Sequence, residues 1–188
     1  MACIALTAGR GLDCNRSSGG VKYLYFAVFD QVISTTIVNS EVTDIDMGAD
    51  SIYRYQPPRG TSQAMETITG STDNGTIFYT PTVNMVLNRL SKSDQQEIKL
   101  LGQTQVIIFA QLNEQLANGH DVIIALGVTN AMALNAGTAD SGTSLADRNG
   151  YSLSFDGFEA DPFPVVVDYS ATPFDNADSG AQIPIITS

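Results

Sequence analysis

The longest stretch of alternating apolar and polar side chains runs from residue 62 to residue 90 and predicts a long β-hairpin. In the second arm, apolar side chains alternate with threonines and asparagines, so one face of the strand is apolar. The apolar members are Ile77, Tyr79, Val83, Met85 and Leu87. The first arm is less apolar, and its larger side chains are Met65 and Ile68.

Two features within this stretch, its tip and a proline, determine its expected geometry. The tip is Asp73-Asn74-Gly75, and an Asn-Gly pair predicts a type I′ turn, whose central residues both need positive φ. Pro81 lacks an N–H donor, so an edge position or a bulge is expected there. A hairpin of this length exceeds what a small domain needs, which predicts contacts between copies. The candidate assembly residues are Met65, Ile68, Asn74, Gly75, Ile77, Tyr79, Val83 and Met85.

The remaining pattern is that of a mainly β domain. Residues 21–29 and 105–110 are apolar on both faces, which is typical of central strands. Further strands are expected at 32–38, 51–55, 122–126, 132–135, 151–156 and 165–167, with a polar connection or edge strand at 41–47 and a loop at 137–147. One helix is expected at 93–101, with Ser93 and Gln96 as a capping box and Gly102 ending it in a left-handed conformation.

These elements predict a two-sheet β-sandwich or barrel with one short α-helix, a long β-hairpin and extended terminal arms. Residues 1–20 form the expected N-terminal arm, residues 21–168 the β domain with hairpin 62–90 and helix 93–101, and residues 169–188 the C-terminal arm. The end of the chain, from Ile183 onward, is apolar enough to dock on another surface.

Charge narrows the choice of partners. The chain has 188 residues and a formal net charge of −11, which argues against nucleic-acid binding and against an anionic membrane surface. No signal peptide or membrane-spanning run is expected. The two cysteines, Cys3 and Cys14, are interpreted as reduced thiols, with a disulfide between them as the alternative.

No catalytic, cofactor-binding or metal-binding constellation is predicted. His120 is the single histidine and follows the Asn118-Gly119 turn, so it is expected on the surface. Neither residues 73–75 nor residues 147–150 have the alternating ligands and distal glutamate of a calcium loop, and both are interpreted as turns. We therefore expect a protein that is not an enzyme and needs no cofactor.

The order of the features resembles the tail tube proteins of long-tailed bacteriophages. The pieces that carry the resemblance are CIALTAGRGLDC with GGVKYLYFAVF, SIYRYQ, TDNGTIFYTPTVNMVLNRL, the helix with QVIIFAQL, and DRNGYSLSFDGFE. They span most of the chain to about Val167, whereas the loop at 137–144 and the tail after Asp168 depart from the pattern. Each piece alone is a generic turn and strand, so the order and spacing carry the resemblance.

The resemblance implies a virion structural protein that is made in the host cytoplasm and located in the tail. Six copies would form a ring, the hairpins would line its inner wall, and stacked rings would form the channel for DNA ejection. The implied partners are other copies of the chain, with tape-measure, tail terminator and baseplate proteins as further candidates. DNA would pass without adhering and no membrane would be involved, because an acidic wall gains nothing from counterion release.

Two alternatives remain open from the sequence. One is a related virion β-sandwich, such as a tail terminator, neck or decoration protein. The other is a secreted β-sandwich that binds a ligand. Within the tube hypothesis, Glu66 is the candidate charge facing the lumen, since it is the only acid within an arm of the hairpin; facing solvent or pairing with a neighbour's arginine is its alternative role.

Overall fold

The computed structural model describes residues 8–11, 17–167, 169–176 and 182–187, so the question of Cys3 and Cys14 lies outside the described residues. The described chain is mainly β, as predicted, with one α-helix. The strands are β1 (Val21–Val28), β2 (Ser34–Val38), β3 (Glu41–Asp46), β4 (Ile52–Tyr55), β5 (Gln63–Ser71), β6 (Thr76–Asn88), β7 (Val106–Gln115), β8 (Asp121–Leu126), β9 (Met132–Asp140), β10 (Gly150–Gly157), β11 (Val165–Val166) and β12 (Ile185–Ile186). The helices are α1 (Lys92–Leu101) and a single 3₁₀ turn, η1 (Phe29–Gln31).

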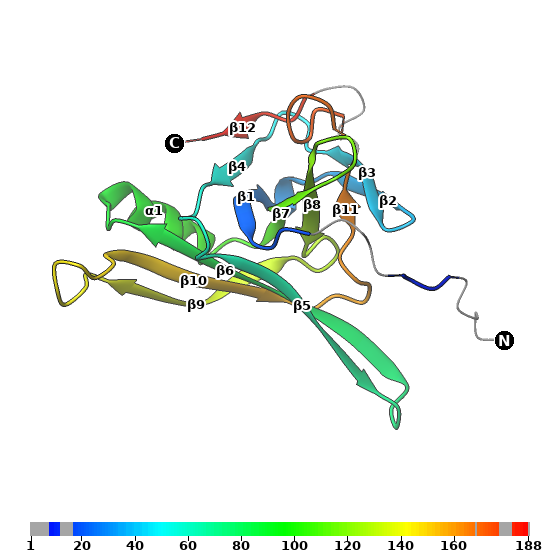
Figure 1. Cartoon of the computed structure of the whole chain (residues 1–188), viewed down its shortest axis with the longest axis horizontal. Helices are drawn as coiled ribbons and strands as arrows, with labels where there is room; N and C mark the ends of the chain where they lie inside the picture. Colours follow the sequence, from blue (N-terminus) through cyan, green and yellow to red (C-terminus); the bar gives the residue numbers. More distant parts are fainter. Residues whose placement is uncertain (1–7, 12–16, 168, 177–181, 188) are drawn as a thin grey trace.

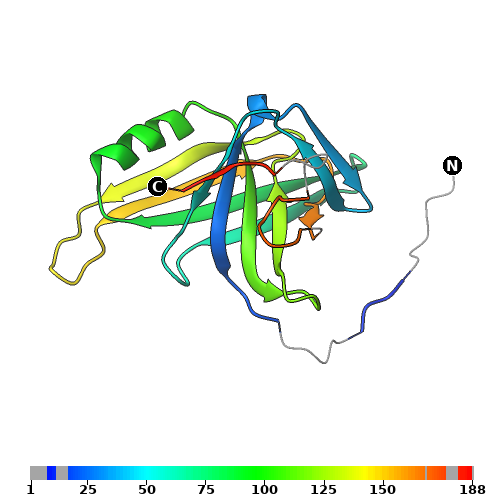
Figure 2. The ribbon, with the colours of Figure 1, turned by 90° about the horizontal axis from the view of Figure 1, so that it is seen from above.

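The strands form two layers that share one bent sheet. One layer has the order β2-β3-β11-β8-β7-β1-β4-β12, and the other has the order β9-β10-β6-β5. A single residue pair, Val106 with Met132, connects the layers through β7 and β9. Figures 1 and 2 show the strands of the four-stranded layer crossing those of the other layer. The sheet does not close on itself, so the described fold is sandwich-like and not a closed barrel.

Buried side chains gather in two cores, one on each face of the larger layer. In β1, Leu24 and Phe26 lie in the core between the layers, whereas Tyr25 and Ala27 lie in the core on the opposite face. This confirms the predicted strand with two apolar faces, which ends at Val28, one residue before its predicted end. In the same way, Ile107 and Ile108 of β7 belong to opposite cores, and both are buried.

The C-terminal segment is part of the domain, which corrects its expected role as an arm. Tyr169, Phe174 and Ile183 are buried in the outer core, where the Phe174 ring lies 5.0 Å from that of Phe109. Beyond Ile183, β12 pairs in parallel with β4. The larger layer needs a cover on its outer face, and these apolar side chains supply it. At the N-terminus, residues 8–11 and 17–20 are exposed, as expected for an arm.

Helix α1 differs from its prediction at both ends. Its N-cap is Ser91 and not Ser93, because the Ser91 hydroxyl accepts the Asp94 N–H at 3.0 Å. Gly102 ends the helix in the right-handed region, with φ −71°, and its N–H still donates to the Ile98 carbonyl. The expected left-handed termination is therefore wrong. Ile98 and Leu101 pack on the inner core, as their shared face predicts.

Strand β9 runs through to Asp140, so the first four residues of the stretch 137–147, which the sequence predicted as a loop, belong to a strand. Its register with β10 is continuous from Gly150–Asp140 to Ser154–Ala136. Apolar alternation is missing here because the strand carries small residues. Gly137 is required by packing, since a Cβ there would lie 2.9 Å from the Leu153 side chain.

Candidate assembly surface

The hairpin of β5 and β6 has a supported half and an overhanging half. From Thr82 to Asn88, β6 is paired with β10 on one edge, and from Thr82 to Asn84 it is also paired with β5 on the other. From Thr76 to Pro81, its regular pairing is with β5 alone, apart from one bridge between Tyr79 and Glu159. Figure 1 shows this half extending away from the rest of the molecule. The predicted hairpin is thus confirmed, and nearly half of β6 lies outside the body.

Two of the predicted assembly residues belong to the core of the subunit itself. Val83 and Met85 are fully buried between the layers, where β10 places Phe155 and Leu153 beside them. Both side chains are therefore unavailable to another copy. The sequence pattern did not distinguish them from Ile77 and Tyr79, which alternate in the same way on the same strand. Tyr79 is half-buried at the boundary between the two halves.

The other predicted residues lie on the overhang or close to it. Ile68 is 63% exposed and Ile77 is 59% exposed, on the face that buries Val83 further along the sheet. Met65 is exposed on the opposite face, as is Phe78, which the sequence analysis did not single out. Both faces of the overhang therefore expose apolar side chains to solvent. Such exposure is typical of a surface that another molecule covers.

The tip is a four-residue turn and not the predicted type I′ turn. The last strand pair is Ser71 with Thr76, so residues 72–75 form the connection. The Asn74 N–H donates to the Ser71 hydroxyl at 3.3 Å, and only Gly75 among the tip residues has a positive φ, of 62°. The side-chain hydrogen bond stabilises the wider turn without a left-handed Asn74.

Pro81 lies where the ladder between β6 and β10 stops, which agrees with the expected edge position. The last ladder pair is Thr82 with Asp156, and the Tyr79 N–H donates to Glu159 O at 2.8 Å further along. Backbone N–H groups two residues apart point to the same edge of a strand. The missing N–H of Pro81 therefore falls on the β10 side and costs no pairing with β5.

The four-stranded layer has one face that carries no core. Its side chains alternate with the buried ones, and they are mostly hydroxyls and amides, none of them buried. The polar side chains of this polar face include Gln63, Thr67, Thr69, Thr80, Thr82, Asn84, Asn88, Thr138, Asp140, Ser152, Ser154 and Asp156. Met65, Phe78 and Val86 lie on the same face. No lysine or arginine occurs in any of the four strands. A surface of this kind offers hydrogen bonds and some negative charge, and its strands supply no cation for a phosphate. The cation that reaches it is Arg148, from the adjacent loop, whose guanidinium donates to the Ser152 hydroxyl.

The same layer ends in two strand edges that lack a regular partner in the described chain. Strand β5 pairs with β6 only, and β9 pairs with β7 at a single residue before continuing along β10. Unpaired N–H and C=O groups at a sheet edge are a template for pairing with another strand. The two edges lie on opposite sides of one layer, so copies placed side by side would bring one edge to the other.

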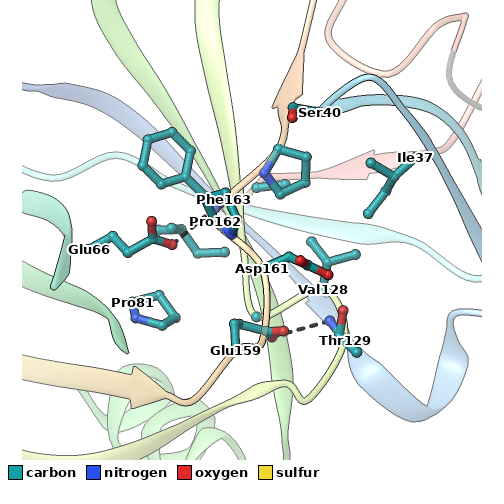
Figure 3. A pocket seen from close by; sticks show the side chains of 14 residues that line it. Ile37, Ser40, Glu66, Pro81, Val128, Thr129, Glu159, Asp161, Pro162 and Phe163 are labelled. Atoms are coloured by element: carbon teal, nitrogen blue, oxygen red, sulfur yellow. Dashed lines mark hydrogen bonds between the residues drawn. The ribbon is translucent and has the colours of Figure 1, made fainter. Parts of the chain in front are cut away.

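A hollow of about 330 Å³ lies at the base of the overhang (Figure 3). It has apolar walls and three carboxylates, and no lysine or arginine is among the described residues that line it. The lining residues are Ile37, Ser40, Glu66, Pro81, Ala125, Leu126, Gly127, Val128, Thr129, Glu159, Asp161, Pro162, Phe163 and Pro164. We refer to it as the hairpin-base pocket.

Glu66 lies in this pocket, on the face of β5 opposite the polar face. Its carboxylate accepts the Phe163 N–H at 3.0 Å. Burial raises the pKa of Glu66, the bond from Phe163 opposes that shift, and the nearby Glu159 charge adds to it. Glu159 is itself buried and accepts the N–H groups of Thr129 and Asn130. Glu66 as a lumen charge stays a prediction, but its place in the pocket favours the alternative of a contact with a neighbour.

The described residues hold no sign of metal chemistry. No group of three or more His, Cys, Asp or Glu side chains among them could hold a metal ion. His120 follows the Gly119 turn, as predicted, but it is half-buried and its ring stacks on Tyr169 at 4.7 Å. It is therefore less exposed than expected for a surface turn. In the described part of the chain, neither helix has the length and hydropathy needed to cross a membrane.

Comparison of the chain with protein-family models, with curated proteins and with solved structures found no match.

One exposed residue had no signal in the sequence. Leu145 is fully exposed in the middle of the loop between β9 and β10. It stands alone among Ser, Thr, Asp and Gly residues, so no periodicity marks it. Only the three-dimensional position of this loop shows that its leucine is isolated from both cores.

Proposed function

We propose that this chain is a virion structural protein, the subunit of a tail tube that assembles as stacked hexameric rings and forms the channel for DNA ejection. The observation that carries the proposal is the overhanging half of the β5–β6 hairpin, with apolar side chains exposed on both faces. An isolated two-stranded hairpin is marginal in water, so an overhang of this length gains its stability from a neighbour.

The two unpaired edges support a ring. When the β5 edge of one copy meets the β9 edge of the next, the contact is heterologous, and a heterologous contact whose rotation closes gives a ring without free edges. In such a ring the four-stranded layers form one continuous wall. The larger layer and α1 then lie on one side of that wall, and the polar face lies on the other.

The polar face supports the passage of DNA. A duplex adheres to a surface chiefly through lysine and arginine, whose contacts with phosphates release counterions. The four strands supply neither residue, and the charged side chains on their polar face are Asp140 and Asp156. A wall built from this face would let DNA slide. In this arrangement Asp140 and Asp156, and not Glu66, are the acidic side chains that face the lumen.

Electron microscopy of the purified protein tests the proposal. A tail tube subunit forms open-ended tubes of stacked rings with a central channel, in a manner that depends on protein concentration. Single closed rings that never elongate would favour a tail terminator or neck protein. A protein that stays monomeric at every concentration would contradict assembly by this surface.

A further inference from the structure

The loop between β9 and β10 places one leucine where nothing in its own subunit covers it. Residues 141–149 are held by hydrogen bonds from within: Asp147 accepts the N–H groups of Thr143 and Ser144, and Asp140 accepts the Gly142 N–H. The bonds from Thr143 and Ser144 lower the pKa of Asp147. Between these anchored residues, Leu145 is fully exposed. The loop therefore presents the side chain from a fixed backbone.

The base of this loop is cationic. The Arg89 and Leu90 N–H groups donate to Asn149, which ties the end of β6 to the loop. This places Arg89 beside Arg148, whose guanidinium donates to the Ser152 hydroxyl, and Lys92 follows at the start of α1. All three cations are exposed. The carboxylates of the loop, Asp140 and Asp147, are already engaged with backbone N–H groups.

The hairpin-base pocket has the complementary character. Its rim exposes Ile37 and Phe163, its floor includes the buried Leu126 and Pro164, and Glu66, Glu159 and Asp161 surround it without a cation among the lining residues. The raised pKa of Glu66 is consistent with a carboxylate that a cation from outside would stabilise.

The loop and the pocket lie at opposite ends of the same strand. Strand β10 begins at Gly150, directly after the loop, and ends at Gly157, directly before the pocket residues 159–164. Eight extended residues separate the two by roughly 25 Å, so a subunit cannot fill its own pocket. Figure 1 shows the loop and the β5–β6 overhang at opposite ends of the four-stranded layer.

We infer that the 141–149 loop of one copy docks in the hairpin-base pocket of another, with Leu145 entering the apolar hollow and Arg148 facing its carboxylates. This inference rests on the proposed function. When the β5 and β9 edges of neighbouring copies meet around a ring, the ends of the strands in each four-stranded layer point toward the rings above and below. The contact thus joins successive rings, and repeated in one direction it forms an open-ended stack.

The test uses four single variants of the full-length protein and one double variant. Leu145→Asp places a charge in the hollow and should raise the concentration needed for tube growth by at least about tenfold. Rings should still form, because the edges are untouched. Leu145→Met is the control and should form tubes at a concentration close to that of the wild type, since volume-conserving apolar changes are tolerated.

Charge reversal tests the orientation of the contact. Arg148→Glu and Asp161→Arg should each weaken stacking, and the double variant should recover a large part of it. Both residues are exposed in the free subunit, so the thermal unfolding of the single variants should match that of the wild type. Recovery in the double variant is a result that a merely structural role would not give.

The outcomes separate this inference from the function on which it rests. Wild-type tubes with Leu145→Asp, or a double variant no better than its parents, would overturn the loop-in-pocket contact and leave the tube proposal standing. A wild-type protein that forms neither rings nor tubes would overturn both. Isolated rings of Leu145→Asp, with tubes from Leu145→Met, would support both.

Discussion

The two halves of strand β6 show how one sequence pattern leads to two different environments. From Thr82 onward, the apolar face is covered by the other layer, and Val83 and Met85 are fully buried. Before Pro81, the same alternation continues on the same face, but Ile77 is 59% exposed. The pattern specifies a strand with an apolar face. What covers that face depends on where β10 ends, which is a property of the tertiary structure.

The largest expected effect is the loss of the buried core, which covers the supported half of β6. Ile108→Asp should abolish folding, because it would place an unpaired carboxylate in the inner core beside Phe26 and Leu126. Ile107→Asp should do the same through the outer core. Circular dichroism and soluble yield measure the loss. Cooperative unfolding of both soluble variants would show that β7 is not central.

A matched pair on β6 tests the comparison within one strand. Val83→Ala should lower the free energy of unfolding by about 2 kcal/mol, whereas Ile77→Ala should change it by less than about 0.5 kcal/mol. Both positions are on one face of the same strand, so they differ mainly in what covers them. Urea denaturation of the monomeric subunit gives both values. Equal losses would mean that the overhang is packed against its own subunit.

Alkaline pH tests the burial of two tyrosines in the larger layer, Tyr55 of β4 and Tyr25 of β1. Burial raises the pKa of Tyr55 to about 12, with the charges of Glu97 and Asp94 contributing, and burial likewise raises the pKa of Tyr25 to about 12. Unfolded tyrosines ionise near pH 10, so their contribution to stability is present below about pH 10 and is lost as the pH rises toward 12.

Tyr55→Phe should therefore reduce the alkaline loss of stability, by on the order of 1 kcal/mol after allowance for solvent screening. Tyr25 should account for much of the rest, and it is best left in place because its hydroxyl donates to Gln111. Urea denaturation at several pH values measures the change. An alkaline slope equal to that of the wild type would contradict the burial of Tyr55.

Much of the fold followed from the sequence because its strands are apolar on faces that the subunit itself covers. Strands β1, β7 and β8 were predicted within a few residues for this reason. Only the start of strand β9, residues 132–135, was predicted, because the residues Ala136, Gly137 and Ala139 that follow are too small to show alternation. The N-cap of α1 was misplaced because Ser91 and Ser93 offer equivalent hydroxyls two residues apart, whereas the last residue, Leu101, was predicted correctly.

The candidate site was predicted less completely, for a physical reason. Ile77 and Val83 carry the same local signal, and Leu145 carries none, so exposure and burial had to come from the structure. Glu66 was chosen as the only acid of the hairpin arms. Its face depends on register, and the structure places it beside Phe163, on the face that Val83 shares.

The smallest effect on stability should come from charge placed on the two faces of the four-stranded layer. Ser154→Lys adds a cation to the polar face and should slow DNA release from assembled particles, more strongly at low ionic strength. Glu66→Lys lies on the opposite face and should leave DNA release unchanged while weakening assembly. Release rates at several salt concentrations distinguish the two. Salt-independent, wild-type release from Ser154→Lys would contradict the polar face as the channel wall.

The central claim is that the overhanging half of the hairpin builds the assembly and contributes little to the fold of the subunit. Removing residues 71–75, or introducing Asp73→Pro, tests it with sedimentation velocity and electron microscopy of wild type and variants at matched concentrations. The account predicts tubes from the wild type and, from both variants, a monomer whose thermal unfolding stays close to that of the wild-type subunit. Normal tubes from either variant would contradict it.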